Sequence, residues 1–123
     1  MSIDQRPMNE KNKTRFLVCR FDTLKEKKTM TWDKMVQHEY KACLLVYIND
    51  QLYTYANSCP HTGINLNWKP NEFLNTDETY IQCAVHGALF DIENGQCLHG
   101  PCLGDSLKPI KSEIIDELIY VYL

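Results

Sequence analysis

The chain has 123 residues, of which 44% are hydrophobic and 24% are charged, with a formal net charge of −3. This length suits a single domain spanning 1–123, and an acidic balance without a basic cluster excludes a nucleic-acid-binding surface. The polar start shows no signal peptide and no stretch has the roughly 20 apolar residues of a membrane helix, so we expect a cytoplasmic protein without a membrane partner.

The first elements are predicted near the N-terminus. Residues 1–13 are polar and are expected to form a flexible tail. Residues 16–21 have the length and residue types of a β-strand. The signal over residues 23–40 is mixed, so a short amphipathic turn and an irregular strand both stay open there. Within it, the charged run at 25–28 indicates a solvated turn.

A β-hairpin is predicted at residues 41–56. Its arms, 41–48 and 51–56, are rich in β-branched, aromatic and aliphatic residues, and Asn49 and Asp50 tolerate the positive φ of a tight turn. Residues 67–79 are polar with few apolar anchors, which indicates a surface insertion.

Short strands are expected in the rest of the chain. Gly95 takes the left-handed position of a turn, and Asp116 and Glu117 form another. Many short strands separated by turn residues indicate an all-β fold, an antiparallel sandwich or partly open barrel. The expected strands are 80–83, 88–91, 107–111, 113–115 and 118–122.

Two short segments each offer one thiolate and one imidazole, namely Cys59-Pro-His61 and Cys83-Ala-Val-His86. A [2Fe–2S] cluster with one iron held by two cysteines and the other by two histidines needs this set. In an extended chain the Cα atoms of Cys59 and His61 lie about 6–7 Å apart, so each loop can reach both irons. For a chain with six cysteines in a reducing compartment, metal ligation is favoured over disulfides.

The surrounding residues carry a resemblance. The patterns C-x-H-x-G-x-x-L and C-x-x-H-G-x-x-F-D, followed by a glycine turn and a Gly-Pro, span roughly residues 57–103 and resemble the Rieske ferredoxin family. The resemblance implies a Rieske-like fold with a small cluster-binding subdomain over 57–103. It also implies one [2Fe–2S] cluster with the ligands Cys59, His61, Cys83 and His86.

The same resemblance implies an electron carrier without catalytic residues or a small-molecule substrate. Its redox partners would be a flavin reductase as donor and an oxygenase or other oxidoreductase as acceptor. The histidines would face outward within an apolar rim. The rim residues would be Pro60, Ile64, Val85 and Leu103.

Non-ligand positions of the motifs have expected roles. We expect Gly63 and Gly87 to let the backbone approach the cluster and point N–H groups at its sulfurs. Gly100 and Pro101 would begin a third loop that covers the cluster. The spacer of 21 residues between His61 and Cys83 is longer than is usual in family ferredoxins, which affects the local loop shape rather than the cluster.

The motifs also indicate a subtype. High-potential relatives carry a disulfide and hydroxyl donors near the cluster, whereas this chain has other residues at those positions. The missing donors predict a reduction potential at the low end of the Rieske range of about −150 to +300 mV. The positions concerned are Ile64, Val85, Ala88 and Phe90.

Two alternatives remain, and a third, an oxygenase acting alone, is disfavoured because 123 residues leave no room for its catalytic domain. A permanently bound small subunit of a larger oxidoreductase would keep the same four ligands. A structural Cys₂His₂ zinc site uses these ligand types but usually begins with two closely spaced cysteines. An oxygenase acting alone would need two further histidines and a carboxylate. Only His38 and His99 remain, and we expect both to be ordinary surface or core residues.

The other cysteines have simpler interpretations. A disulfide between Cys97 and Cys102 is possible from their spacing, but nothing in the low-potential pattern requires it. Cys19, Cys43 and Cys97 are expected to be small buried apolar residues.

Overall fold

The structure is a computed structural model that describes residues 13–60, 66, 72–83 and 87–123. It contains nine strands and one short helix within these residues. The predicted tail lies outside the described residues, apart from Lys13. In chain order the elements are β1 (Arg15–Arg20), α2 (Phe21–Lys27), β2 (Thr29–Val36), β3 (Glu39–Ile48), β4 (Gln51–Ala56), β5 (Tyr80–Gln82), β6 (Leu89–Asp91), β7 (Cys97–His99), β8 (Ser112–Ile115) and β9 (Leu118–Tyr122).

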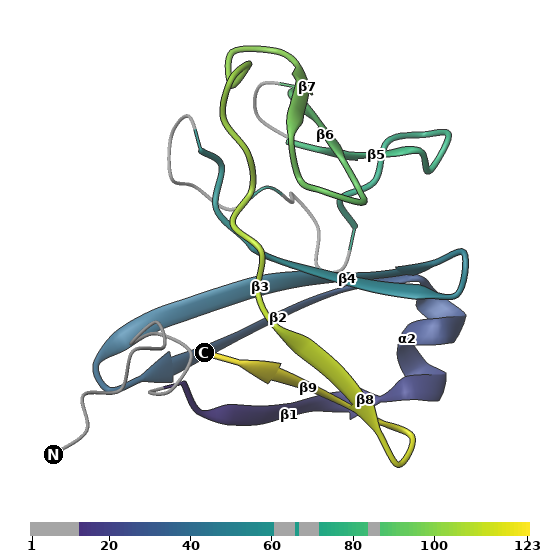
Figure 1. Cartoon of the computed structure of the whole chain (residues 1–123), viewed down its shortest axis with the longest axis vertical. Helices are drawn as coiled ribbons and strands as arrows, with labels where there is room; N and C mark the ends of the chain where they lie inside the picture. Colours follow the sequence, from purple (N-terminus) through teal and green to yellow (C-terminus); the bar gives the residue numbers. More distant parts are fainter. Residues whose placement is uncertain (1–12, 61–65, 67–71, 84–86) are drawn as a thin grey trace, which may run out of the picture.

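The strands form three antiparallel sheets of three strands each, in the orders β1-β9-β8, β2-β3-β4 and β5-β6-β7. The first two sheets lie over one another with α2 at one side, and the small sheet β5-β6-β7 stands at the other end of the molecule (Figure 1). The all-β prediction is therefore confirmed. Within the described residues no sheet closes into a barrel.

The predicted hairpin at 41–56 is confirmed. β3 and β4 pair in register up to the closing pair of Ile48 and Gln51. Asn49 and Asp50 between them have φ of 53° and 63°, as a tight turn with two left-handed residues requires. The turn at Asp116 and Glu117, with φ of 51° and 68°, joins β8 to β9 in the same way.

The segment at 23–40 that the sequence left open contains most of helix α2 and the regular strand β2, which pairs with β3 along its whole length. The helix begins at Phe21, which was expected to end the first strand. Residues 25–28 are exposed, as expected of a solvated segment, but they form the second half of α2 and its C-terminal cap rather than a separate turn. Leu24 in this helix is fully buried. The ring of Phe21 meets the ring of Tyr47 edge-on at 4.9 Å between centroids. Packing on these two side chains stabilises a helix too short to form alone.

Residues 107–111 do not form the expected strand. The segment runs beside β4 through an isolated bridge between Tyr55 and Pro109. Ile110 N–H donates to the Thr54 carbonyl at 2.9 Å. Pro109 lacks an N–H, so a regular ladder cannot continue through it. A strand that the sequence did not predict, β7, forms one edge of the small sheet β5-β6-β7.

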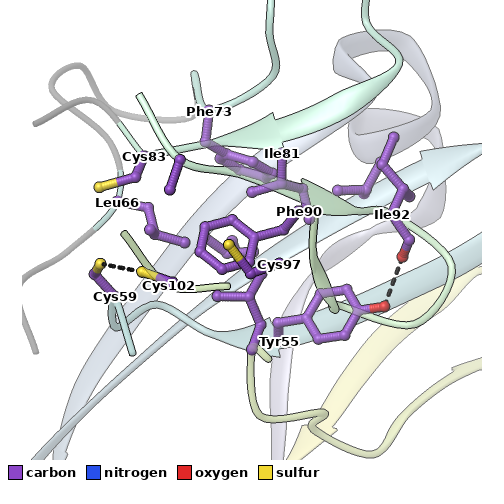
Figure 2. Close-up of a cluster of buried hydrophobic side chains, with 14 residues drawn as sticks. Tyr55, Cys59, Leu66, Phe73, Ile81, Cys83, Phe90, Ile92, Cys97 and Cys102 are labelled. Carbon is purple, nitrogen blue, oxygen red and sulfur yellow. Dashed lines mark hydrogen bonds between the residues drawn. The ribbon is translucent and has the colours of Figure 1, made fainter. Parts of the chain in front are cut away.

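Two groups of buried side chains form the interior. The base core lies between the two larger sheets and consists of Leu24, Cys43, Leu45, Ile119 and Val121. The loop-side core lies between β3, β4 and the small sheet (Figure 2) and consists of Leu44, Val46, Tyr55, Cys59, Leu66, Phe73, Ile81, Cys83, Ala88, Phe90, Ile92, Cys97, Cys102 and Leu107.

The predicted surface insertion is only partly at the surface. Residues 67–71 lie outside the described residues, but Phe73 is 3% exposed and belongs to the loop-side core. Leu74 pairs with Ile81 through an isolated bridge. The described end of this segment therefore packs against the small sheet.

Candidate functional site

Cys59 and Cys83 lie just beyond the ends of two strands. Cys59 follows β4 and Cys83 follows β5, and their exposed fractions are 1% and 0%. Their sulfur atoms lie on the same side of the loop-side core, away from Tyr55 and Ile92 (Figure 2). All six cysteines of the chain are described, and none of them forms a disulfide. Both sulfurs thus remain available as ligands.

The other half of the predicted ligand set is His61 and His86. Both histidines lie outside the described residues, as do Gly63, Ile64 and Val85. Among the described residues, no three His, Cys, Asp or Glu side chains converge to hold a metal ion. The assignment of the four ligands therefore stays a prediction.

Asn57 fixes the base of the first loop. Its backbone N–H donates to the Ala42 carbonyl at 2.9 Å, and its side-chain Oδ1 accepts from the Leu66 N–H at 2.8 Å. Asn57 is 5% exposed, and Leu66 is fully buried. This amide therefore ties together two positions on either side of the first motif. The motif pattern did not identify Asn57, because its role depends on contacts distant in sequence.

The second loop is closed by its own backbone. Cys83 N–H donates to the Ala88 carbonyl and Gly87 N–H donates to the Cys83 carbonyl, each at 2.8 Å. Gly87 has a φ of +68°, which favours glycine. The N–H of Gly87 itself is used in closing the loop, and the expected approach of this backbone to a cluster sulfur stays a prediction. The glycine allows the tight return from Cys83 to β6.

The third loop begins at Gly100, as predicted, and packs against the second. It is held by an N–H of Asp105 that donates to the Cys102 carbonyl at 2.8 Å and by an N–H of Cys97 that donates to the Asp105 carbonyl at 3.0 Å. Cys102 is fully buried, and its Sγ lies 3.7 Å from the Sγ of Cys59. The third loop therefore brings a third thiol beside the first predicted ligand.

The other three cysteines, Cys19, Cys43 and Cys97, are not predicted ligands. Cys97 and Cys102 do not form a disulfide, and the Cys97 thiol donates to the His99 carbonyl at 3.4 Å. Burial raises the pKa of Cys43 to about 12, which keeps it an unreactive thiol in the base core. Cys19 is only half-buried, unlike the expectation.

His38 and His99 are exposed. His38 occupies the turn between β2 and β3 with a φ of 68°. Both histidines are thus surface residues, one of the two ordinary roles expected for them. Leu103 is 65% exposed and Pro60 is half-buried, so these two members of the predicted rim are at least partly at the surface.

Comparison with known families decides the cofactor. The profile of the Rieske [2Fe–2S] domain matches residues 14–113. The chain belongs to this family. One [2Fe–2S] cluster is therefore the cofactor that the domain implies, and a structural zinc site is not needed to explain the predicted ligand set. A comparison with functionally curated proteins found no match.

Solved structures share the Rieske fold at low sequence identity. The ferredoxin of carbazole 1,9a-dioxygenase from Nocardioides aromaticivorans is 22% identical with a TM-score of 0.68, and the match covers 88% of this chain and 96% of that one. The plasma-membrane Rieske protein of the cyanobacterium Synechocystis PCC 6803 is 22% identical with a TM-score of 0.62, covering 86% and 97%. A third match is a complex of reduced oxygenase and oxidised ferredoxin in carbazole 1,9a-dioxygenase, at 19% identity and a TM-score of 0.68, covering 89% and 94%.

The described residues of the Rieske domain fit such a cluster. Two buried thiols, from Cys59 and Cys83, lie on one side of an apolar core and are not consumed in disulfides. Buried thiolates need a cation or donors to offset the loss of water, and iron supplies that positive charge. In the described part of the chain, no helix is long and apolar enough to cross a membrane.

Proposed function

We propose that this Rieske protein is a soluble, cytoplasmic one-electron carrier that takes electrons from a flavin reductase and passes them to an oxygenase or another oxidoreductase. The observation that carries the proposal is the pair of buried thiols at Cys59 and Cys83 on one side of the loop-side core. When bound, the cluster supplies one-electron oxidation and reduction. The similarity to a ferredoxin seen in complex with an oxygenase supports this kind of acceptor.

The four proposed ligands are Cys59, His61, Cys83 and His86. The protein holds the two cysteine sulfurs in a dry environment: Asn57 anchors the first loop, and the bonds between Cys83, Gly87 and Ala88 close the second. The exposed Leu103 and the half-buried Pro60 would then contribute to an apolar contact surface for a redox partner.

The apolar residues around the proposed cluster favour a Rieske centre of low reduction potential. Ala88 and Phe90 are both fully buried, and neither carries a hydroxyl that would donate to a cluster or ligand sulfur. Fewer donors stabilise the reduced, more negative cluster less, so the potential should fall at the low end of the Rieske range.

The electron paramagnetic resonance spectrum of the dithionite-reduced protein tests the ligand set. We expect the low average g value of a Rieske centre, and the variants His61→Ala and His86→Cys should each abolish that spectrum. A Cys₄-type spectrum from the wild-type protein, or an unchanged spectrum from either variant, would show that the ligand assignment is wrong.

A second candidate is a permanently bound Rieske subunit of a larger oxidoreductase. It would use the same four proposed ligands, so the buried thiols at Cys59 and Cys83 fit it as well as they fit a carrier. Purification from the native cell separates the two cases: a carrier elutes alone, whereas a subunit copurifies with a partner at fixed stoichiometry.

A further inference from the structure

The third loop supplies a thiol whose role the motifs do not explain. Cys102 is fully buried, and its Sγ lies 3.7 Å from the Sγ of Cys59, although the two residues are 43 positions apart. Figure 2 shows the two sulfur atoms facing one another at the edge of the loop-side core. This distance is that of an S–H···S hydrogen bond in which either sulfur can be the donor.

Ligation decides the direction of this hydrogen bond. A cysteine that binds iron does so as a thiolate and has no proton to donate. Cys59 as a ligand is therefore the acceptor, and the Cys102 thiol must keep its proton and donate it. A thiol is a weak donor toward a neutral group, but a charged acceptor in a dry site strengthens the bond.

The backbone holds Cys102 in this position. The third loop is closed by the bond from Asp105 N–H to the Cys102 carbonyl at 2.8 Å. Gly100, two residues before Cys102, packs directly on Ala88 of the second loop. The thiol is thus oriented by the same contacts that pack the second and third loops together.

We infer that Cys102 is a positioning and tuning residue that donates an S–H···S hydrogen bond to the Cys59 ligand and raises the reduction potential of the cluster. The inference rests on the proposed function, because it requires Cys59 to be a ligand. The donor is more strongly attracted when the cluster has gained an electron, so it stabilises the reduced state more than the oxidised state. It partly offsets the absence of hydroxyl donors at Ala88 and Phe90.

Redox titration of the holoprotein, followed by electron paramagnetic resonance, tests the inference. Cys102→Ala removes the donor and should lower the reduction potential while the g values remain those of a Rieske centre. Cys97→Ala is the matched control, because Cys97 lies in the same core but donates to the His99 carbonyl. Its potential should stay at the wild-type value. An unchanged or raised potential in Cys102→Ala would overturn the inference.

A second measurement uses the unmodified holoprotein, in case Cys102→Ala does not retain a cluster. The infrared difference spectrum between the reduced and oxidised states should contain an S–H stretching band that moves to lower frequency on reduction. That band should disappear in Cys102→Ser, which keeps a small polar side chain. The absence of a redox-sensitive S–H band in the wild-type protein would overturn the inference.

Failure of the proposed function and failure of the role inferred for Cys102 give different experimental results. If the wild-type protein has no Rieske spectrum, the ligand assignment fails before Cys102 is considered. If the wild-type spectrum is present and Cys102→Ala leaves the potential unchanged, only the role of Cys102 fails.

Discussion

Gly100 lies so close to Ala88 that a Cβ at Gly100 would come within 2.9 Å of the Ala88 Cα. Gly100 also has a φ of +107°, which residues with a side chain rarely adopt. Ala88 is fully buried, so the clash falls on backbone and cannot be relieved by moving a flexible side chain. The contact sets how closely the third loop approaches the second.

Gly100→Ala should therefore destabilise the protein and separate these two loops. Gly104→Ala is the matched control, since Gly104 has a φ of +96° but a Cβ there would meet no atom of the described residues within 4 Å. Backbone strain of about 1–3 kcal/mol applies to both variants, and only Gly100→Ala adds the clash. Urea unfolding should give the larger loss for Gly100→Ala; equal losses would show that the contact with Ala88 does not matter.

Cys83→Ala should lose the cluster, because it removes one of the two proposed sulfur ligands. We expect iron and acid-labile sulfide to fall to background in this variant. Cys97→Ala changes a cysteine of the same core that is not a proposed ligand, and it should keep both. Retention of iron and sulfide by Cys83→Ala would contradict the assignment, as would their loss from Cys97→Ala in a protein that remains folded.

Tyr55→Phe should reduce stability by roughly 1–2 kcal/mol near neutral pH. The Tyr55 hydroxyl donates to the buried Ile92 carbonyl at 2.6 Å, and the variant leaves that acceptor unpaired. Tyr40→Phe is a control, because its hydroxyl donates to Asp33 at an exposed position. Urea unfolding should therefore show little change for the control.

The contribution of Tyr55 to the free energy of unfolding should also depend on pH. Burial raises the pKa of Tyr55 to about 12, and the negative charge of Asp91 acts in the same direction. The folded protein therefore favours the neutral hydroxyl. The resulting stabilisation is complete below the ordinary tyrosine pKa near 10 and is lost as the pH rises toward 12. The stability gap between wild type and Tyr55→Phe should narrow over this interval, and a constant gap would contradict the prediction.

Leu24→Ala should destabilise the protein by about 2–5 kcal/mol, because Leu24 is fully buried in the base core and a cavity would replace it. Glu26→Ala, at an exposed position of the same helix, should change stability by less than about 0.5 kcal/mol. Thermal unfolding of both variants tests whether α2 depends on the burial of Leu24. Equal small effects would show that it does not.

The parts of the fold that were predictable depend on neighbours in sequence. Asn49 and Asp50 specify a tight turn by their own conformational preferences, and the arms of that hairpin carry strand-forming residues. Helix α2 was missed because Arg20 at its N-cap makes no side-chain capping hydrogen bond, so no start signal marks it. Its anchor, Leu24, is recognisable only from packing against the two sheets.

The candidate site was likewise predictable only where it depends on neighbours in sequence. The spacing of Cys59 and Cys83 with their histidines identifies the motif and the family without any structure. The supporting contacts are invisible at that level, because each joins distant segments: Asn57 with Leu66, and Cys102 with Cys59. The burial of Phe73 likewise depends on the small sheet that it covers.

Strand β3 forms a shared wall between the two interiors. Cys43 and Leu45 face the base core, whereas Leu44 and Val46 face the loop-side core. Adjacent side chains on a strand point to opposite faces, so inserting or deleting one residue upstream within this strand would reverse both sets together. A one-residue shift in the register of β3 would therefore misplace the buried side chains of both cores at once.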